Sequence, residues 1–344
     1  KLRGRLCFLT VAGGSLFSTL TGSSMANTAM LGSLMVPEMQ KRGYNWQMSM
    51  GPILGTGGLA MIIPPSALGV LLASVASIDV GKLLIAGFLP GFVLAGLYSV
   101  MIYLQLRINP ESAPAYDVDM PPMAERIKIV CVNILPMGFI VFMVVGFIIL
   151  GWATPTEAAG FGVLGVIIVA AAFRCLSFEA IKTATHATVK VGAMVFFIIM
   201  SSTVFSQLLA FSGASAGLLK WTISFGISKY WILLLMFFVL IALGMFMDAT
   251  SMMLITVPIF FPLASQLGFD LIWFGLFVLM TFEMAGTTPP FGLLLYVMLG
   301  VAPKGTTLYQ VAASAFPFLV CDAILILLMV QWPQLALWLP SLMG

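Results

Sequence analysis

Three polar side chains, Ser23, Ser24 and Asn27, lie close together between two apolar segments. Their hydroxyl and amide oxygens are neutral ligands suited to a small cation, and a helix that begins at Ser24 presents free N–H groups that attract an anion. The same residues also fit a plain helix start, with a serine cap and small residues for close packing. We favour a site for Na⁺ and a carboxylate, because an interrupted apolar segment is expected to face this one.

A second polar segment carries the carboxylate of Asp248 beside the hydroxyls of Thr250 and Ser251. An uncompensated charge at the centre of a membrane costs about 3 kcal/mol on insertion scales. A bound cation or the free N–H groups of a helix start would compensate it. We therefore expect Asp248 to cap the following helix and to take part in cation binding, and the two roles are compatible.

Two further acids lie in apolar sequence. Glu283 precedes the second of two interrupted segments, where it is either a ligand for a proton or cation or a neutral, hydrogen-bonded carboxylic acid. Both interpretations stay open. Asp322 lies in the last apolar segment, where we expect a contact between helices.

The elements that must position these residues are broken helices. Two Pro-Pro pairs, Pro64-Pro65 and Pro289-Pro290, stand in apolar stretches long enough to cross a bilayer. Each proline removes a backbone donor and clashes with the preceding turn. A break at membrane depth leaves unpaired backbone groups, which are tolerated only where they line a cavity or bind something. Paired interruptions in two halves of a chain indicate the binding site of a transporter.

The composition is that of a polytopic, all-α membrane protein. Of 344 residues, 61% are hydrophobic and only 8% are charged, whereas soluble domains average about 25% charged residues. A net charge of +3 gives no indication of nucleic-acid binding. The sequence has no glycine-rich phosphate loop followed by Lys and Ser or Thr, so we expect no ATPase activity.

The apolar segments that are long enough to cross the membrane are 88–106, 129–151, 156–173, 188–211, 230–246 and 313–332, and the interrupted stretches are 46–77 and 270–300.

The interrupted stretches belong to an internal repeat. Seven residues recur at a fixed offset of 225 positions, over the 29 positions that end with Pro65. Each unit consists of a re-entrant hairpin with a polar tip, followed by a broken span. Most basic residues fall on one side, with Arg3 and Arg42 at the base of the first hairpin and Lys82 on the opposite side. This bias places the two hairpins on opposite sides of the membrane, so the repeat is inverted.

Four regions follow from this plan. We predict a first transport-core repeat over 1–86, a scaffold with connecting helices over 87–229, a second repeat over 230–312 and a C-terminal transmembrane helix over 313–344. Segments 78–86 and 304–312 are predicted as short interfacial helices. The chain begins with Lys1 rather than Met, and we interpret it as lacking its natural N-terminus.

Several motifs resemble the large membrane subunit of a TRAP transporter, the tripartite ATP-independent periplasmic family. They are Thr21–Asn27, Gly57–Ser66, Ala76–Asp79 followed by Leu89-Pro-Gly91, Thr154–Glu157 and Thr287–Gly292. The resemblance covers essentially the whole chain. It implies an elevator-type, Na⁺-coupled secondary transporter in the bacterial inner membrane, with a small membrane subunit and a periplasmic substrate-binding protein as partners, and no cofactor besides the coupling ion.

The resemblance also implies where ligands bind. The first cation site would comprise Ser23, Ser24, Asn27, Gly58, Pro64 and Pro65. The second would comprise Asp248, Thr250, Ser251, Gly286, Thr287, Thr288 and Pro289. The substrate, a small anionic solute and most simply a carboxylate, would contact Ser24, Ser66, Thr250 and Thr288.

Two alternatives remain. One is an ion-coupled carboxylate carrier that needs no soluble receptor. The other, more remote, is an intramembrane aspartyl protease that uses Asp248 and Glu283, which would have to face each other as a dyad.

Overall fold

The computed structural model describes residues 3–115, 122–213, 217 and 226–342. Lys1, on which the predicted N-terminal truncation rests, therefore lies outside the described residues. The fold divides into two compact units. The first contains the described residues of 1–117 and 206–342, and the second contains those of 118–205.

The first unit carries both predicted tips and both Pro-Pro breaks. In chain order its helices begin with α1 (Arg5–Thr21), α2 (Ser24–Lys41), α3 (Trp46–Ile62), α4 (Ala67–Ala76), α5 (Val80–Ala86) and α6 (Phe88–Ile108), followed by the 3₁₀ turn η1 (Pro110–Ser112). They continue with α13 (Lys229–Gly244), α14 (Ala249–Gln266), α15 (Leu271–Thr287), α16 (Leu293–Val301), α17 (Leu308–Gln331) and α18 (Gln334–Ser341).

The second unit consists of three long helical stretches. The first runs from Met123 to Ile149 as α7 (Met123–Ile129), α8 (Leu135–Val141) and α9 (Phe147–Ile149), joined by the π-helical turns η2 (Val130–Ile134) and η3 (Phe142–Gly146). It is followed by α10 (Pro155–Ala172) and α11 (Phe178–Phe211), whose last residues belong to the first unit. Six helices among the described residues are long and apolar enough to cross a membrane, or seven if the bent pair α3–α4 is one span.

The helix bounds follow the 225-residue offset. α2 and α14 cover equivalent positions, and so do α3 and α15. Their starts are fixed by equivalent caps: Ser23 caps α2 as Asp248 caps α14, and Asn45 caps α3 as Asp270 caps α15. Each of these side chains accepts from backbone N–H groups that a first helical turn leaves unpaired. Polar residues at the same two points of each repeat thus begin these four helices.

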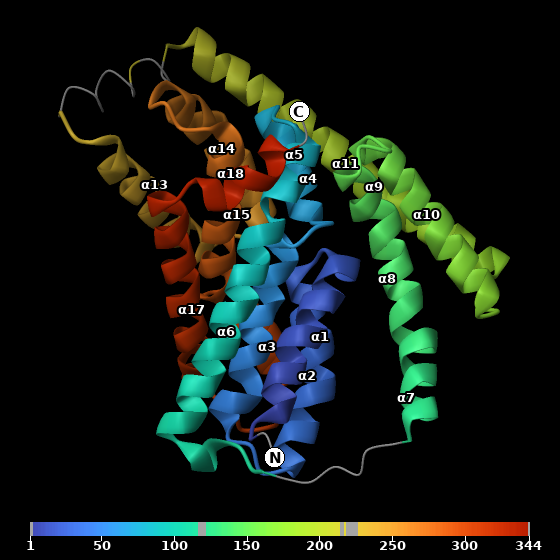
Figure 1. The fold of residues 1–344 in the computed structure, drawn as a ribbon. Coiled ribbons are helices and arrows are strands. Elements are labelled where there is room, and N and C mark those ends of the chain that lie inside the picture. The colour runs from blue at the N-terminus through green and yellow to red at the C-terminus, as the bar shows by residue number, and fades with distance from the viewer. Residues whose placement is uncertain (1–2, 116–121, 214–216, 218–225, 343–344) are drawn as a thin grey trace. The chain divides into compact units, whose positions relative to one another are not determined.

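The two broken segments lie at the centre of the first unit. α3 ends at Ile62 and α4 begins at Ala67 with a bend of 41°. α15 ends at Thr287 and α16 begins at Leu293, and both Pro-Pro peptide bonds are cis. α3 packs against α1, α2, α6, α15 and α17, in the middle of the helices of the first unit (Figure 1). Almost all of its side chains are therefore buried. The first break is therefore inside the protein, with Pro64 and Ser66 buried, whereas Pro289 and Pro290 of the second break are exposed.

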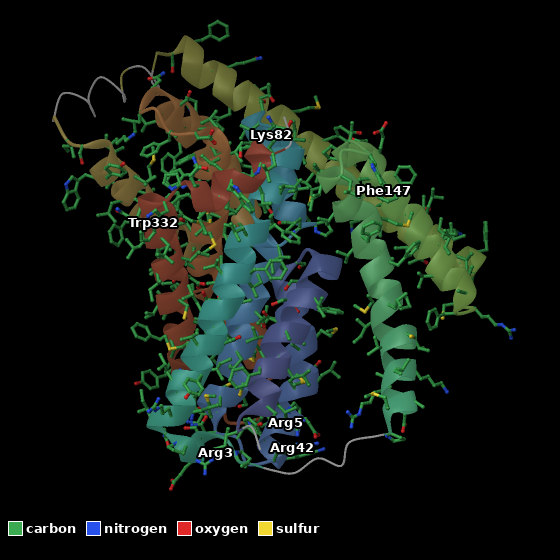
Figure 2. The ribbon with its side chains drawn as sticks, in the orientation of Figure 1. Arg3, Arg5, Arg42, Lys82, Phe147 and Trp332 are labelled. Atoms are coloured by element: carbon green, nitrogen blue, oxygen red, sulfur yellow. The ribbon has the colours of Figure 1, made fainter. Side chains whose placement is uncertain are left out.

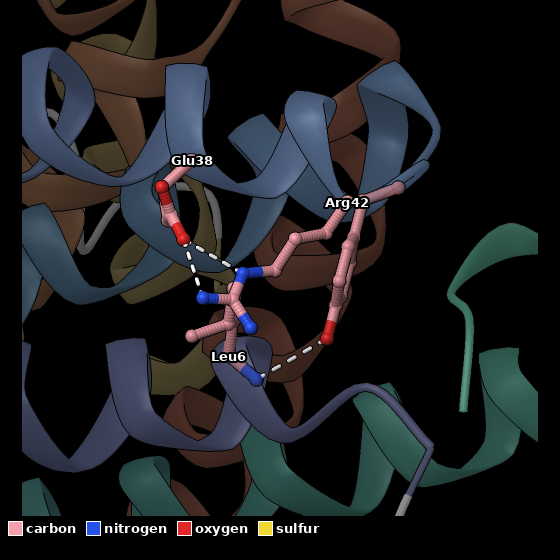
Figure 3. Close-up of polar contacts among 4 residues, drawn as sticks. Leu6, Glu38 and Arg42 are labelled. Carbon is pink, nitrogen blue, oxygen red and sulfur yellow. Dashed lines mark hydrogen bonds and ion pairs between the residues drawn. The ribbon is translucent and has the colours of Figure 1, made fainter. Parts of the chain in front are cut away.

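Charged residues mark the two ends of the first unit. Arg3, Arg5 and Arg42 lie at the end that holds the N-terminus, and Lys82 lies at the opposite end (Figure 2). At the first end, the Arg42 guanidinium contacts the Glu38 carboxylate at 2.6 Å, and the backbone N–H of Leu6 donates to the Tyr44 hydroxyl at 3.4 Å (Figure 3). The second contact ties α1 to the loop after α2, at the base of the first hairpin.

Several elements differ from the sequence-based expectation. α11 begins at Phe178, ten residues before the predicted span at 188, because the polar residues that precede the apolar run continue the same helix. Segment 304–312 is not a separate interfacial helix, since α17 begins at Leu308 with a capping box between Thr307 and Gln310. α18 was not predicted at all. By contrast, the predicted helix in 78–86 is present as α5.

Candidate functional site

The tip of the first hairpin touches the first break. Gly22, between α1 and α2, has φ +55° and lies so close to the break that an added Cβ would be 3.3 Å from the Pro65 carbonyl oxygen. Ser23 caps α2 by accepting from the Ala26 N–H at 3.4 Å. The structure therefore places Gly22, the neighbour of the predicted Ser23, beside the predicted Pro65, and glycine supplies the left-handed turn between the helices.

Three oxygen-bearing side chains behind this tip are buried without a hydrogen-bond partner. They are the hydroxyls of Ser24 and Thr28 and the amide oxygen of Asn27. The Asn27 amide nitrogen donates to the Ser18 hydroxyl at 2.7 Å and to the Thr56 carbonyl oxygen at 3.0 Å, which fixes the side chain. Buried polar atoms normally have partners, so three unpartnered oxygens on consecutive turns of one helix indicate a place for a ligand.

Glycines let α3 approach this cluster. An added Cβ at Gly57 would collide with the Thr28 hydroxyl and lie 3.5 Å from the Ser24 carbonyl oxygen. The neighbouring Gly58, predicted as part of the first cation site, instead faces the carboxyl group of Glu283. Gly57 rather than Gly58 thus borders the oxygen cluster.

The tip of the second hairpin is held by Asp248. Its carboxylate accepts from the Thr250 N–H at 2.9 Å, the Ser251 N–H at 3.3 Å and the Ser251 hydroxyl at 2.6 Å. The predicted cap is therefore present. It also gathers Asp248, Thr250 and Ser251, three predicted ligands of the second cation site, within one turn.

The second break orients two carbonyl oxygens. An added Cβ at Gly292 would lie 2.7 Å from the Gly286 carbonyl oxygen and 2.8 Å from that of Thr288. The hydroxyls of Thr287 and Thr288 donate back to the Met284 carbonyl oxygen at 3.1 and 2.6 Å. The threonine hydroxyls thus stabilise the last helical turn. Beyond it, the Thr288 carbonyl oxygen accepts from the Gly292 N–H at 3.1 Å, and the Gly286 carbonyl oxygen also lies close to Gly292.

A cavity of about 250 Å³ lies between the two tips. Ser23 and Ser24 line it from the first tip, and Asp248 and Thr250 line it from the second. The break residue Gly286 also borders it. Of the four predicted substrate contacts, Ser24 and Thr250 reach this cavity. Ser66 and Thr288 are not among its lining residues, and the Ser66 hydroxyl accepts from the Gly69 N–H at 3.0 Å to cap α4.

Glu283 and Asp248 line different cavities. Glu283 shares its small cavity with Asp322 and Thr287, whereas Asp248 faces the cavity between the tips. The dyad required by the protease alternative is therefore not formed by these two acids.

Residues 1–335 match the family model described as tripartite ATP-independent periplasmic transporter, DctM component. The chain belongs to this transporter family. It is accordingly a multi-pass protein of the bacterial inner membrane and a permease component of a TRAP transporter, not an enzyme.

Curated TRAP relatives align along the whole chain. The C4-dicarboxylate large permease protein DctM of Pseudomonas aeruginosa is 31% identical over 100% of this chain and 79% of its own length. The ectoine/5-hydroxyectoine large permease protein UehC of Ruegeria pomeroyi is 28% identical over 99% of this chain and 78% of its own. The YdaH transporter of Alcanivorax borkumensis has a similar fold, with TM-score 0.60 and 16% identity, over 96% of this chain and 84% of that one.

Sequence reasoning missed three residues of these sites. Thr28 follows Asn27 directly but has no counterpart in the second repeat, where Met253 stands. Gly292 could have been found from its position just beyond the second Pro-Pro pair. Tyr98, whose hydroxyl donates to the Asp322 carboxyl group, lies in an apolar segment and carried no sequence signal.

Proposed function

We propose that this TRAP permease takes up a small carboxylate-bearing solute by Na⁺-coupled secondary transport, with the cavity between the two tips as the solute site. The observation that carries this proposal is the placement of both hairpin tips around one cavity of about 250 Å³. That volume is near the lower end of small-ligand pockets.

The first cation site is assigned to the unpartnered oxygens of Ser24, Asn27 and Thr28, with Ser23, Pro64 and Pro65 at its edge. All three oxygens belong to buried or nearly buried side chains. Neutral oxygens suit Na⁺, a hard cation that needs no charged ligand. A cation here would satisfy three polar atoms that otherwise carry the full cost of desolvation.

The second cation site is assigned to Asp248, Thr250 and Ser251 with the break residues Gly286, Thr287, Thr288 and Pro289. Its support is the carboxylate of Asp248 together with the carbonyl oxygens that converge on Gly292. This site contains a formal charge, whereas the first contains none. The two are therefore expected to differ in affinity.

The solute site combines two helix N-termini with one carboxylate. α2 begins at Ser24 and α14 begins at Ala249, and both residues line the cavity. Their free N–H groups favour an anion. Asp248 would repel the same anion, and a cation bound beside it removes that repulsion. We therefore expect the cation to bind before the anionic solute.

Alternating access is assigned to an elevator movement of the two hairpins and two broken spans as a mobile core. α2 and α14 begin and end at positions one repeat offset apart, and so do α3 and α15, which supports a repeat. Arg42 and Lys82 lie at opposite ends of the first unit, which supports the inversion of that repeat. The division into core and scaffold at 86, 229 and 312 stays a prediction. α6 and α17, predicted outside the core, belong to the same compact unit as the hairpins.

The partners assigned are a small membrane subunit and a periplasmic substrate-binding protein. The relatives are named for C4-dicarboxylates and for ectoine, so the solute differs within the family. A receptor that delivers the solute would set this choice.

Reconstitution tests the proposal. The permease is placed in liposomes with its small subunit, and uptake of labelled C4-dicarboxylate and ectoine is measured with and without an inward Na⁺ gradient and with and without the binding protein. We expect uptake only with both. Uptake that ignores Na⁺ would refute the coupling, and uptake without the binding protein would favour the receptor-independent carrier.

A further inference from the structure

An apolar groove lies between α13, α15 and α17 of the first unit, away from the cavity between the tips. Its volume is about 370 Å³, and all of its described lining residues are apolar or aromatic. Tyr230, Leu234 and Leu327 line it and remain exposed. We call this feature the α13–α17 groove, and its other lining residues include Phe237, Phe277 and Ala323.

The surroundings of the α13–α17 groove are lipid, because the chain is a multi-pass membrane protein. Lipid tails are as apolar as the groove, so no hydrophobic force draws another protein into it. An empty groove would lose the dispersion contacts of the side chains that line it. An occupant is therefore favoured, and acyl chains are the material that surrounds the protein.

The size of the groove separates an acyl chain from a protein helix. A helix with its side chains is about 10–12 Å across and rises about 5.4 Å per turn. A volume of about 370 Å³ holds only about 3–5 Å of such a cylinder, which is less than one turn. A single acyl chain is much narrower and fits this space.

A cation stands at one end of the groove. Lys229 begins α13 directly before Tyr230, and its ammonium group lies 5.6 Å from the centre of the Tyr230 ring and 5.1 Å from that of Phe269. These two rings hold the ammonium group in place. Asp270, which follows Phe269, uses its carboxylate to cap α15. Among the described residues no carboxylate forms an ion pair with Lys229, so its charge is available to a phosphate.

Aromatic residues place this end of the groove at the membrane surface. Tyr230 and Trp231 follow Lys229, Trp332 follows the end of α17, and all three rings are exposed. Such residues collect where the bilayer meets water. Trp332 lies toward the end of the first unit that carries Lys82 (Figure 2). The Lys229 charge is thus at the depth of lipid headgroups, and the groove extends from it along α13.

We propose that the α13–α17 groove binds one phospholipid with an anionic headgroup, whose phosphate meets Lys229 and whose acyl chain lies between α13 and α17. The apolar walls accept the chain of any phospholipid. Lys229 supplies the preference for negative charge. This site is independent of the cation sites and of the solute.

Native mass spectrometry of the purified, intact transporter tests the preference for charge. The protein is exchanged into lipid-free detergent and titrated with phosphatidylglycerol, which is anionic, or with phosphatidylcholine of the same chain length, which has no net charge. We expect the first phosphatidylglycerol to bind about fivefold more tightly than the first phosphatidylcholine, the effect of one Lys near an anionic surface.

Lys229→Gln should abolish this preference. Lys304→Gln is the matched control, because Lys304 is an exposed lysine of the same unit and lies in the loop before α17. The control should keep the wild-type preference for phosphatidylglycerol. A preference that is the same in Lys229→Gln and in the wild type would overturn the proposal.

Ala323→Phe tests the groove itself. The added ring would fill the space between α13 and α17 and exclude the acyl chain, whereas Ile324→Phe alters a neighbouring residue that does not line the groove. We expect loss of the first bound lipid in Ala323→Phe only. Thermal unfolding without lipid shows whether both variants fold, and Leu234→Trp repeats the test from the opposite wall if Ala323→Phe does not.

Two further outcomes would overturn the proposal. One is undiminished binding of phosphatidylglycerol in both groove-filling variants. The other is a wild type that binds no phosphatidylglycerol, combined with weaker association of Ala323→Phe with the small membrane subunit. In that case a protein helix, rather than a lipid, covers the groove.

Discussion

The Glu283 carboxyl group occupies the space where a side chain at position 58 would stand. Gly58 and Glu283 are equivalent positions of the two repeats, since the same offset of 225 residues relates α3 to α15. One repeat thus supplies a buried acid and the other supplies the space for it. The two halves share their helices and caps, but they are not interchangeable at this point.

Gly58→Ala should destabilise the protein. An added methyl group would overlap the Glu283 carboxyl group, and overpacking of this kind costs about 1–3 kcal/mol. Thermal unfolding of the purified transporter measures the effect. Gly96→Ala is the matched control, because a Cβ at Gly96 of α6 meets nothing within 4 Å. Adding Glu283→Ala to Gly58→Ala should recover part of the loss, and simple additivity would contradict the contact.

Thr28→Val should weaken Na⁺ binding at the first site. The substitution keeps the shape of the side chain and removes an unpartnered buried hydroxyl. Loss of one ligand is expected to reduce affinity on the order of tenfold. The Na⁺-dependent rise in unfolding temperature reports this change, because a ligand stabilises the state it binds. Thr10→Val is the control, since that buried hydroxyl donates only to the Leu6 carbonyl oxygen within its own helix. Equal Na⁺ responses in both variants would remove Thr28 from the site.

Asp248→Asn should remove the negative charge of the second cation site while it keeps the helix cap of α14. Asparagine caps a helix about as well as aspartate, so the fold of α14 should survive, while a cation at the second site loses its charged ligand. We expect Na⁺-dependent uptake to require much higher Na⁺ concentrations. Asp270→Asn is the matched control, because Asp270 caps the equivalent end of α15 by accepting from Ile272 and Trp273 but does not line the cavity. Equal uptake curves for the two variants would argue that Asp248 is only a cap.

The capping pattern explains how much of the fold the sequence predicts. Pro-Pro pairs and polar residues at a fixed offset are local signals, and they place the breaks and the starts of α2 and α14 correctly. The pairing of Glu283 with Asp322 was not predictable, since it depends on how α15 meets α17. The sequence likewise could not predict that Gly58 faces Glu283, because this neighbour comes from the other half of the chain.

Gly292→Ala should impair the second cation site through the backbone. A Cβ at this position would lie 2.7 Å from the Gly286 carbonyl oxygen and 2.8 Å from that of Thr288. Because both are backbone atoms next to a Pro-Pro pair, they cannot move aside as a flexible side chain would, and one of the two carbonyl groups must turn away. We expect Na⁺ affinity to fall at least tenfold, the size of effect that follows from losing one well-placed ligand. Na⁺-dependent uptake measures it, with Gly300→Ala of α16 as the control because a Cβ there meets nothing within 4 Å. If Gly292→Ala retains the wild-type Na⁺ dependence, the converging carbonyl groups are not cation ligands, and the second site reduces to the side chains around Asp248.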